Sequence, residues 1–166
     1  MKAEERSQEP ITVEDLSTFA EIAKNDRIKF FKNNPDYKEH YLCAALCQGA
    51  ALHYLDGVNG IKDIDIWSFY VSTGDTKDFP PRRPRPKCDL GPTKFGVHPD
   101  DARDGYKGRR VDLFGRSISA LENDDPVEAV RRYLREGRTK SARHLRQKAM
   151  VLIEPETLRG TIVWPE

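Results

Sequence analysis

Polar and apolar residues alternate along the run DIDIWSFYV, from Asp63 to Val71. In a strand, Asp63, Asp65, Trp67 and Phe69 point to one face, and the residues between them point to the other. We therefore predict a strand over Asp63–Val71 that carries two carboxylates side by side. Neighbouring carboxylates repel each other at neutral pH, so both stay ionised only with a cation between them or water over both. We favour a divalent cation.

Apolar residues at helical spacing mark three further segments. The predicted helices run from Thr12 to about Phe31, from Asp125 to Gly137, and from Thr139 to about Met150. Thr12 is a predicted N-cap, with Asp15 three positions on in place of the usual Glu. Asp125 followed by Pro126 is a typical helix start, because a proline at the first helical position loses no hydrogen bond.

The remaining segments are less regular. Tyr41–Cys47 is uniformly apolar, so periodicity alone allows either a buried strand or part of one helix from Asp36 to Leu55. Arg109–Phe114 has a strand pattern between two glycines. We also predict an irregular strand or hairpin over Lys87–Val97, a short strand or packed tail over Thr161–Trp164, and an exposed proline-rich loop over Gly74–Lys87.

Length and composition predict one globular domain over residues 1–166. Residues 1–10 are expected to be a frayed leader, and residues 126–166 a C-terminal helical segment and tail. Of the 166 residues, 37% are hydrophobic, which is enough for a core. No apolar run approaches the roughly 18 residues of a membrane helix, and the first residues lack a signal-peptide core. We therefore expect a cytoplasmic protein without membrane contact, with Cys43, Cys47 and Cys88 as reduced thiols.

Charge is unevenly distributed along the chain. Residues 1–66 hold 8 Lys and Arg against 12 Asp and Glu, although the whole chain has a net charge of +1. The segment Arg131–Lys148 contains eight basic residues and a single acid, Glu136. Two interpretations remain open: these residues are the solvated faces of two helices, or they follow the phosphates of a nucleic acid such as RNA.

A glycine-containing turn precedes the acidic strand. Gln48-Gly49-Ala50 lies between the apolar run 41–47 and a short amphipathic helix over Ala51–Leu55. A glycine at such a position lets the backbone approach a ligand, and the free N–H groups of a helix start favour an anion such as phosphate. A third carboxylate, Asp112, lies between Val111 and Leu113 and so points away from the face that these two residues bury. Asp89 and Asp104 compete for this role.

Together, the apolar run, the small turn, the short helix and the sequence Asp-Ile-Asp-Ile resemble the DNA polymerase beta-like nucleotidyltransferase superfamily. GAALHYLDG followed by KDIDI is most similar to the group that includes the abortive-infection toxin nucleotidyltransferases. The resemblance covers residues 41–71 and extends loosely to Phe114. The chain departs from the family motif, in which glycine is followed by glycine or serine: either Gln48 replaces the first glycine or Ala50 replaces the serine.

The resemblance implies an α/β (α+β) fold with a small mixed sheet flanked by helices. It implies transfer of a nucleoside monophosphate from a nucleoside triphosphate to an acceptor hydroxyl of RNA, protein or a small molecule. Asp63, Asp65 and Asp112 would bind two Mg²⁺ ions, and Gln48, Gly49 and Ala50 would form the nucleotide site. The chain would be the toxin of a toxin–antitoxin pair, with an antitoxin protein as partner. The alternative is an inactive module of the same fold that binds nucleic acid or protein.

Several other residues have two possible roles. Lys62, Arg109 and Arg110 either neutralise phosphate charge or lie at solvated strand ends. Arg82, Arg83 and Arg85 either line the mouth of the site or belong to a solvated connector. His53 and His144 are expected on helix surfaces. A zinc site of His40, Cys43 and Cys47 is disfavoured, because the paired Cys-x-x-Cys spacing is absent from the sequence.

Overall fold

The computed structural model describes residues 6–72, 88–101, 105–121 and 124–166. The predicted loop over Gly74–Lys87, with Arg82, Arg83 and Arg85, lies outside these residues, as does Asp104. Among the described residues, no helix is long and apolar enough to cross a membrane.

A six-stranded mixed sheet forms the centre of the fold, so the predicted α/β (α+β) class is confirmed. The strand order is β3-β4-β2-β1-β5-β6. The strands are β1 (Tyr41–Cys47), β2 (Asp65–Val71), β3 (Cys88–Asp89), β4 (Arg110–Ile118), β5 (Met150–Glu154) and β6 (Ile162–Trp164). β2 and β4 are parallel, whereas the other pairs are antiparallel. Tyr41–Cys47 is therefore a strand, and the helical alternative is wrong.

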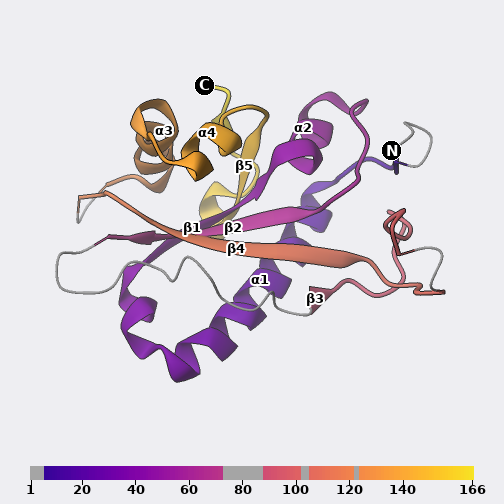
Figure 1. Cartoon of the computed structure of the whole chain (residues 1–166), viewed down its shortest axis with the longest axis horizontal. Coiled ribbons are helices and arrows are strands. Elements are labelled where there is room, and N and C mark those ends of the chain that lie inside the picture. Colours follow the sequence, from indigo (N-terminus) through magenta and orange to yellow (C-terminus); the bar gives the residue numbers. More distant parts are fainter. Residues whose placement is uncertain (1–5, 73–87, 102–104, 122–123) are drawn as a thin grey trace.

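Helices cover both faces of the sheet (Figure 1). On one face lies α1 (Val13–Asn33), and on the other lie α3 (Pro126–Glu136) and α4 (Lys140–Leu145). α2 (Gln48–Asp56) follows β1 directly, and two short 3₁₀ helices, η2 (Pro35–His40) and η4 (Glu156–Leu158), lie in connections. The result is a three-layer arrangement with the sheet in the middle.

Alternation along β1 divides the apolar residues between two cores. Ala44 and Leu46 pack towards α1, whereas Cys43, Ala45 and Cys47 pack towards α3 and α4. Cys43, Cys47 and Cys88 form no disulfide in the described part of the chain, and both thiols of β1 are fully buried. Burial raises the pKa of the Cys43 and Cys47 thiols, because a thiolate would lose its hydration there.

A buried ion pair joins α1 to the sheet. The Arg27 guanidinium contacts the Glu154 carboxylate and donates a hydrogen bond of 3.2 Å to Ser68 Oγ. Tyr41 donates its hydroxyl hydrogen to the same carboxylate at 2.5 Å, and its ring lies 4.2 Å from the Arg27 guanidinium carbon. The charge of Glu154 is thus matched by hydrogen bonds inside the protein, as a buried charge requires.

Two predicted helix starts are confirmed. Thr12 and Asp15 form a capping box: the Asp15 N–H donates to Thr12 Oγ1 at 3.2 Å, and the Thr12 N–H donates to the Asp15 carboxylate at 2.7 Å. Asp125 caps α3 through the Val127 N–H, and Pro126 occupies the first helical position.

Three predicted segments differ from the structure. The helix from Thr139 ends at Leu145, and Met150–Glu154 is the strand β5. Because Val151 and Ile153 pack into the core on the α1 side and Met150 and Leu152 into the core on the α3 and α4 side, both faces of β5 are buried and its apolar run shows no strand alternation. The acidic strand begins at Asp65, two residues later than predicted. The predicted segment Lys87–Val97 is described from Cys88 onwards, and within these described residues only Cys88–Asp89 is a strand.

The N-terminal segment also differs from the prediction. Residues 1–5 lie outside the described part of the chain, but Ser7 pairs with Ile61 in an antiparallel bridge. His53, expected on a helix surface, is buried and bonds to the Glu9 carbonyl, whereas His144 is exposed as expected. Residues 6–10 are therefore attached to the domain.

Candidate active site

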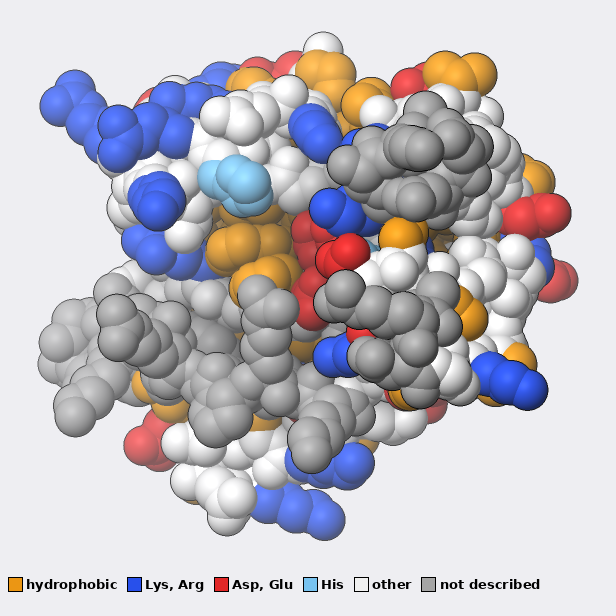
Figure 2. Space-filling view, turned by 45° about the vertical axis from the view of Figure 1, so that its right-hand side comes forward, with side chains coloured by type: hydrophobic (Ala, Val, Ile, Leu, Met, Phe, Trp, Pro, Cys, Tyr) orange, Lys and Arg blue, Asp and Glu red, His pale blue; other side chains and the backbone are white. Residues whose placement is uncertain are grey.

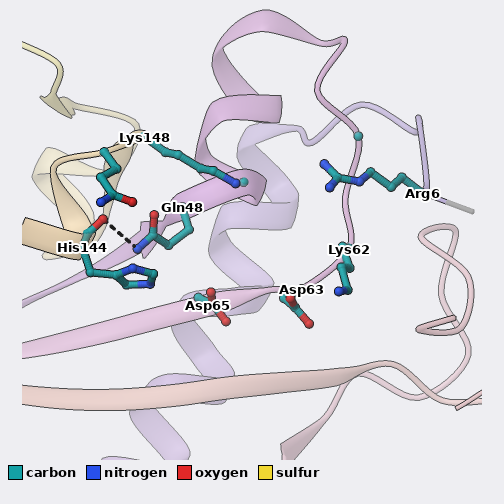
Figure 3. A pocket seen from close by; sticks show the side chains of 10 residues that line it. Arg6, Gln48, Lys62, Asp63, Asp65, His144 and Lys148 are labelled. Carbon is teal, nitrogen blue, oxygen red and sulfur yellow. Dashed lines mark hydrogen bonds between the residues drawn. The ribbon is translucent and has the colours of Figure 1, made fainter. Parts of the chain in front are cut away.

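A cavity of about 210 Å³ opens where β1 ends and β2 begins. Its walls come from four parts of the chain: the N-terminal segment, the start of α2, the segment before β2, and the end of α4 with the residues that follow it (Figure 3). The charged and titratable side chains in these walls are Arg6, Lys62, Asp63, Asp65, His144 and Lys148.

Two of the predicted carboxylates lie on neighbouring strands. Asp65 on β2 and Asp112 on β4 are register partners in the parallel pair, so their side chains leave the same face of the sheet. Register partners have Cα atoms about 4.8 Å apart, which brings two acids side by side. The Asp112 N–H donates to the Ile64 carbonyl at 2.9 Å, which fixes the start of β4 beside the acids of the other strand. The structure thus brings Asp65 and Asp112 together, whereas the role of Asp112 stays a prediction.

Asp63 lies two residues before Asp65, outside β2, and its side chain is 45% exposed. Its Oδ1 lies 2.8 Å from His98 Nε2, and His98 Nδ1 accepts the Asp100 N–H at 3.0 Å. Because Nδ1 accepts a hydrogen bond, the neutral ring carries its proton on Nε2 and donates it to Asp63. Within the described ranges, no three His, Cys, Asp or Glu side chains are grouped as a metal site. Asp63 lines the cavity, and its carboxylate is hydrogen-bonded to His98.

The other two candidates for the third carboxylate do not compete in the structure. Asp89 accepts the N–H groups of Gly91 at 2.6 Å and of Arg109 at 2.8 Å, so it stabilises the turn around β3. Asp104 lies outside the described residues.

The turn at the start of α2 has an unusual backbone. Gln48 has φ +63°, in the left-handed region that favours glycine, although its N–H is bonded to the Ala149 carbonyl at 2.9 Å. Its side-chain Nε2 donates to the His144 carbonyl at 3.2 Å (Figure 3). A glycine at position 48 would adopt this conformation without the strain that a Cβ brings.

Gln48 and Gly49 line the cavity, but Ala50 is fully buried. A side chain at Gly49 would have its Cβ 3.3 Å from Asn59 Nδ2 and 3.9 Å from Lys148 Nζ. The same Asn59 amide donates to the Gly49 carbonyl at 3.1 Å and so ties the turn to the segment before β2. No side chain caps the N-terminus of α2. The open turn leaves space for a ligand beside the Lys148 ammonium group.

Basic side chains face the acids across this cavity. Arg6, Lys62 and Lys148 reach it from three separate segments, and the exposed His144 lies beside them. Figure 2 shows acidic side chains in a hollow next to hydrophobic ones, with Lys and Arg side chains nearby. Carboxylates beside several cations are suited to an anionic ligand that carries its own metal ion, such as a metal-bound polyphosphate.

Arg109 and Arg110 do not enter the cavity. Arg109 is only 1% exposed and donates to the backbone carbonyls of Ile61, at 3.5 Å, and Lys62, at 2.5 Å. Burial lowers the pKa of its guanidinium group, although the negative charge of Asp63 opposes this change. The expectation of a phosphate contact or a solvated strand end is wrong for Arg109, which instead holds the segment before Asp63. Arg110 is exposed and pairs with Asp101.

The fully buried Cys47 thiol lies next to the acids. Cys47 is the register partner of Asp65 across the β1–β2 pair. Burial raises the pKa of this thiol, and the negative charge of Asp65 raises it further. Cys47 is therefore a neutral residue of the core that α3 and α4 cover and not a nucleophile.

Half of the basic residues in Arg131–Lys148 make contacts within the protein. Arg131 donates to the carbonyls of Ile162 and Val163, and Arg146 to those of Leu134 and Gly137. Arg132 pairs with Asp124, and Arg135 pairs with Glu128 and Glu166. The exposed residues Arg138, Lys140, Arg143 and Lys148 remain available for an anionic partner.

Sequence reasoning does not place Arg6, His98, His144 or Lys148 at the site. The sequence predicts a frayed leader around Arg6 and a helix surface for His144. Recognising β5 as a strand would have placed the preceding Lys148 at a sheet end, but no sequence signal places Arg6 at the cavity.

No protein-family model, curated protein or solved structure matches this chain, so the functional assignment rests on its own residues.

Proposed function

We propose that this cavity binds a nucleoside triphosphate with Mg²⁺ and transfers the nucleoside monophosphate to an acceptor hydroxyl. The observation that carries the proposal is that Asp65, which lines the cavity together with Gly49, is in register with Asp112 on the neighbouring strand β4. A divalent cation bound between these carboxylates would offset their mutual repulsion, and the turn and Lys148 offer a place for phosphate in the cavity that Asp65 lines.

Each group has a defined part in the transfer. Asp65 and Asp112 are hard oxygen donors that suit Mg²⁺, and Asp63 would join them on leaving His98. Bound Mg²⁺ would neutralise charge on the phosphates and lower the pKa of the acceptor hydroxyl. The acceptor oxygen bonds to the α-phosphorus, the bond to the β-phosphate oxygen breaks, and pyrophosphate leaves. Asp112 accepts the proton of the hydroxyl.

The direct test uses triphosphates labelled at the α-phosphate. The protein is incubated with each of the four ribonucleotides and Mg²⁺, alone, with RNA, or with small hydroxyl compounds. Asp65→Asn and Asp112→Asn should each reduce label transfer roughly a hundredfold or more, because each removes a charge that stabilises the transition state. Asp36→Asn, an exposed carboxylate in η2, is the matched control and should transfer at the wild-type rate.

One observation favours a second function, an inactive module of this fold. The Gln48 side chain spans from the turn to the His144 carbonyl, where the family motif has glycine. If Gln48 keeps triphosphate out, wild type neither transfers label nor binds nucleotide in a Mg²⁺-dependent way. Gln48→Gly should then restore nucleotide binding in equilibrium dialysis, while binding of RNA to the exposed basic residues of α4 stays unchanged. Nucleotide binding by wild type itself would exclude this second function.

A further inference from the structure

The N-terminal strap, residues 6–9, lies against the segment that leads into the acids. The Ser7 N–H donates to the Ile61 carbonyl at 3.1 Å, and the Ile61 N–H donates back to Ser7 at 2.8 Å. Two residues on, the Glu9 carbonyl lies 2.9 Å from His53 Nε2. Two hydrogen bonds of a β-bridge and one side-chain bond therefore fix the path of the strap.

The position of the strap is specified by its partners. His53 Nδ1 accepts the Gly60 N–H at 2.9 Å, so the neutral ring carries its proton on Nε2 and donates it to Glu9. Gly60 has φ +79°, and a Cβ there would lie 2.9 Å from Arg6 Cβ and 2.7 Å from Gln8 Nε2. Only glycine allows this close approach, so Gly60 is required for the strap to pack against the segment before β2.

The strap brings the Arg6 side chain to the cavity, on the wall opposite Lys148 (Figure 3). Within the described part of the chain, the Arg6 guanidinium donates one long hydrogen bond, 3.4 Å to the Asn59 carbonyl. A guanidinium group has five N–H donors in a planar fork that matches phosphate oxygens. Arg6 lines the cavity, so N–H groups of its guanidinium beyond the one bonded to Asn59 can bind a ligand there.

We propose that Arg6 binds the β- and γ-phosphates of the triphosphate, which makes the N-terminal strap part of the substrate site. This inference rests on the proposed function. Lys148 beside Gly49 and Arg6 beside Gly60 hold the polyphosphate from two walls. The acids lie on the sheet between them, where the α-phosphate would be placed. The ligand that the strap recognises is therefore a polyphosphate chain and not a base or sugar.

The test is equilibrium binding of inorganic tripolyphosphate, of nucleoside triphosphates and of nucleoside monophosphates to the full chain with Mg²⁺. Arg6→Gln should weaken tripolyphosphate and triphosphate binding about tenfold and leave monophosphate binding within about twofold. Arg6→Lys, which keeps the charge but loses the fork, should weaken both about threefold. Lys29→Gln removes one exposed charge from α1, on the other face of the sheet, and should bind as wild type does.

A second variant tests the strap without removing a charge. Gly60→Ala places a Cβ against Arg6 and should reproduce the tripolyphosphate defect, with the melting temperature recorded as a check of folding. Equal tripolyphosphate affinity of wild type and Arg6→Gln would overturn this inference and leave the proposed function standing. If wild type binds neither tripolyphosphate nor any nucleotide, both proposals fail.

Discussion

The left-handed backbone of Gln48 can be tested by asking which of two variants, Gln48→Gly or Gln48→Ala, is the more stable. In an ordinary helix, alanine is more stable than glycine by about 1 kcal/mol. At φ +63° the order reverses, because a Cβ in the left-handed region costs roughly 1 kcal/mol and glycine has none. The difference in unfolding free energy between Gln48→Gly and Gln48→Ala therefore reports whether the backbone at position 48 is left-handed.

The magnitude follows from the contacts of Gln48. Both variants lose the hydrogen bond from Nε2 to the His144 carbonyl, worth about 1 kcal/mol, so this loss cancels in their difference. The remaining difference in stability between the two variants comes from the Cβ of alanine at φ +63°. We expect Gln48→Gly to be more stable than Gln48→Ala by roughly 1 kcal/mol, or about 3 °C in melting temperature for a chain of this length.

Urea and thermal unfolding, followed by circular dichroism, measure this difference. Ala50→Gly is the matched control: it lies in the same helix without a positive φ, and glycine there should destabilise by about 1 kcal/mol. A Gln48→Ala variant as stable as Gln48→Gly, or more stable, would refute the left-handed start of α2.

Three further predictions concern the acids, the thiols and the buried ion pair. With Mg²⁺ at ten times its dissociation constant, wild type should gain about 1.4 kcal/mol of stability, and Asp112→Asn should gain less; thermal shift with and without EDTA measures this. Burial and the negative charge of Asp65 raise the pKa of the Cys47 thiol, so Cys47 should resist a thiol reagent at pH 8 in the native protein and react with it in urea. Half-buried Cys88 should react under both conditions. Arg27→Ala should destabilise by about 3 kcal/mol in urea unfolding, because it leaves Glu154 partly buried without its cation.

Each of these predictions has a contrary outcome. Equal Mg²⁺ stabilisation of wild type and Asp112→Asn would exclude Asp112 from the cation site. Labelling of Cys47 in the native protein at the rate of Cys88 would mean that β1 opens readily. Lys29→Ala on the exposed side of α1 should cost less than about 0.5 kcal/mol, and a similar cost for Arg27→Ala would mean that the ion pair contributes little.

Local patterns in the sequence predict the elements of the site but not their pairing. Alternation correctly places Asp65, Trp67 and Phe69 on one face, and the position of Asp112 between two buried residues correctly gives its direction. The register of Asp65 with Asp112 depends on which strand lies next to β2. That choice is made by tertiary packing between segments 47 residues apart, so no local pattern contains it.

The missed elements have specific physical causes. The apolar run of β5 follows Ala142, Leu145 and Ala149, whose spacing also fits a helix, so the pattern hides the boundary between α4 and the strand. Arg6 lies in a polar segment whose attachment is made through backbone hydrogen bonds to Ile61. Backbone hydrogen bonds of this kind do not require hydrophobic side chains, so the hydrophobic pattern of the sequence does not predict them.

The position of β1 in the sheet has a consequence for how the protein is made. β1 pairs with β2 on one edge and with β5 on the other, and more than 100 residues separate β1 from β5 along the chain. A ribosome-bound chain that has not yet released Met150 exposes one edge of its most apolar strand and lacks the wall that carries Lys148. The cavity is therefore completed late in synthesis, and a partly made chain offers an open strand edge to chaperones or to other chains.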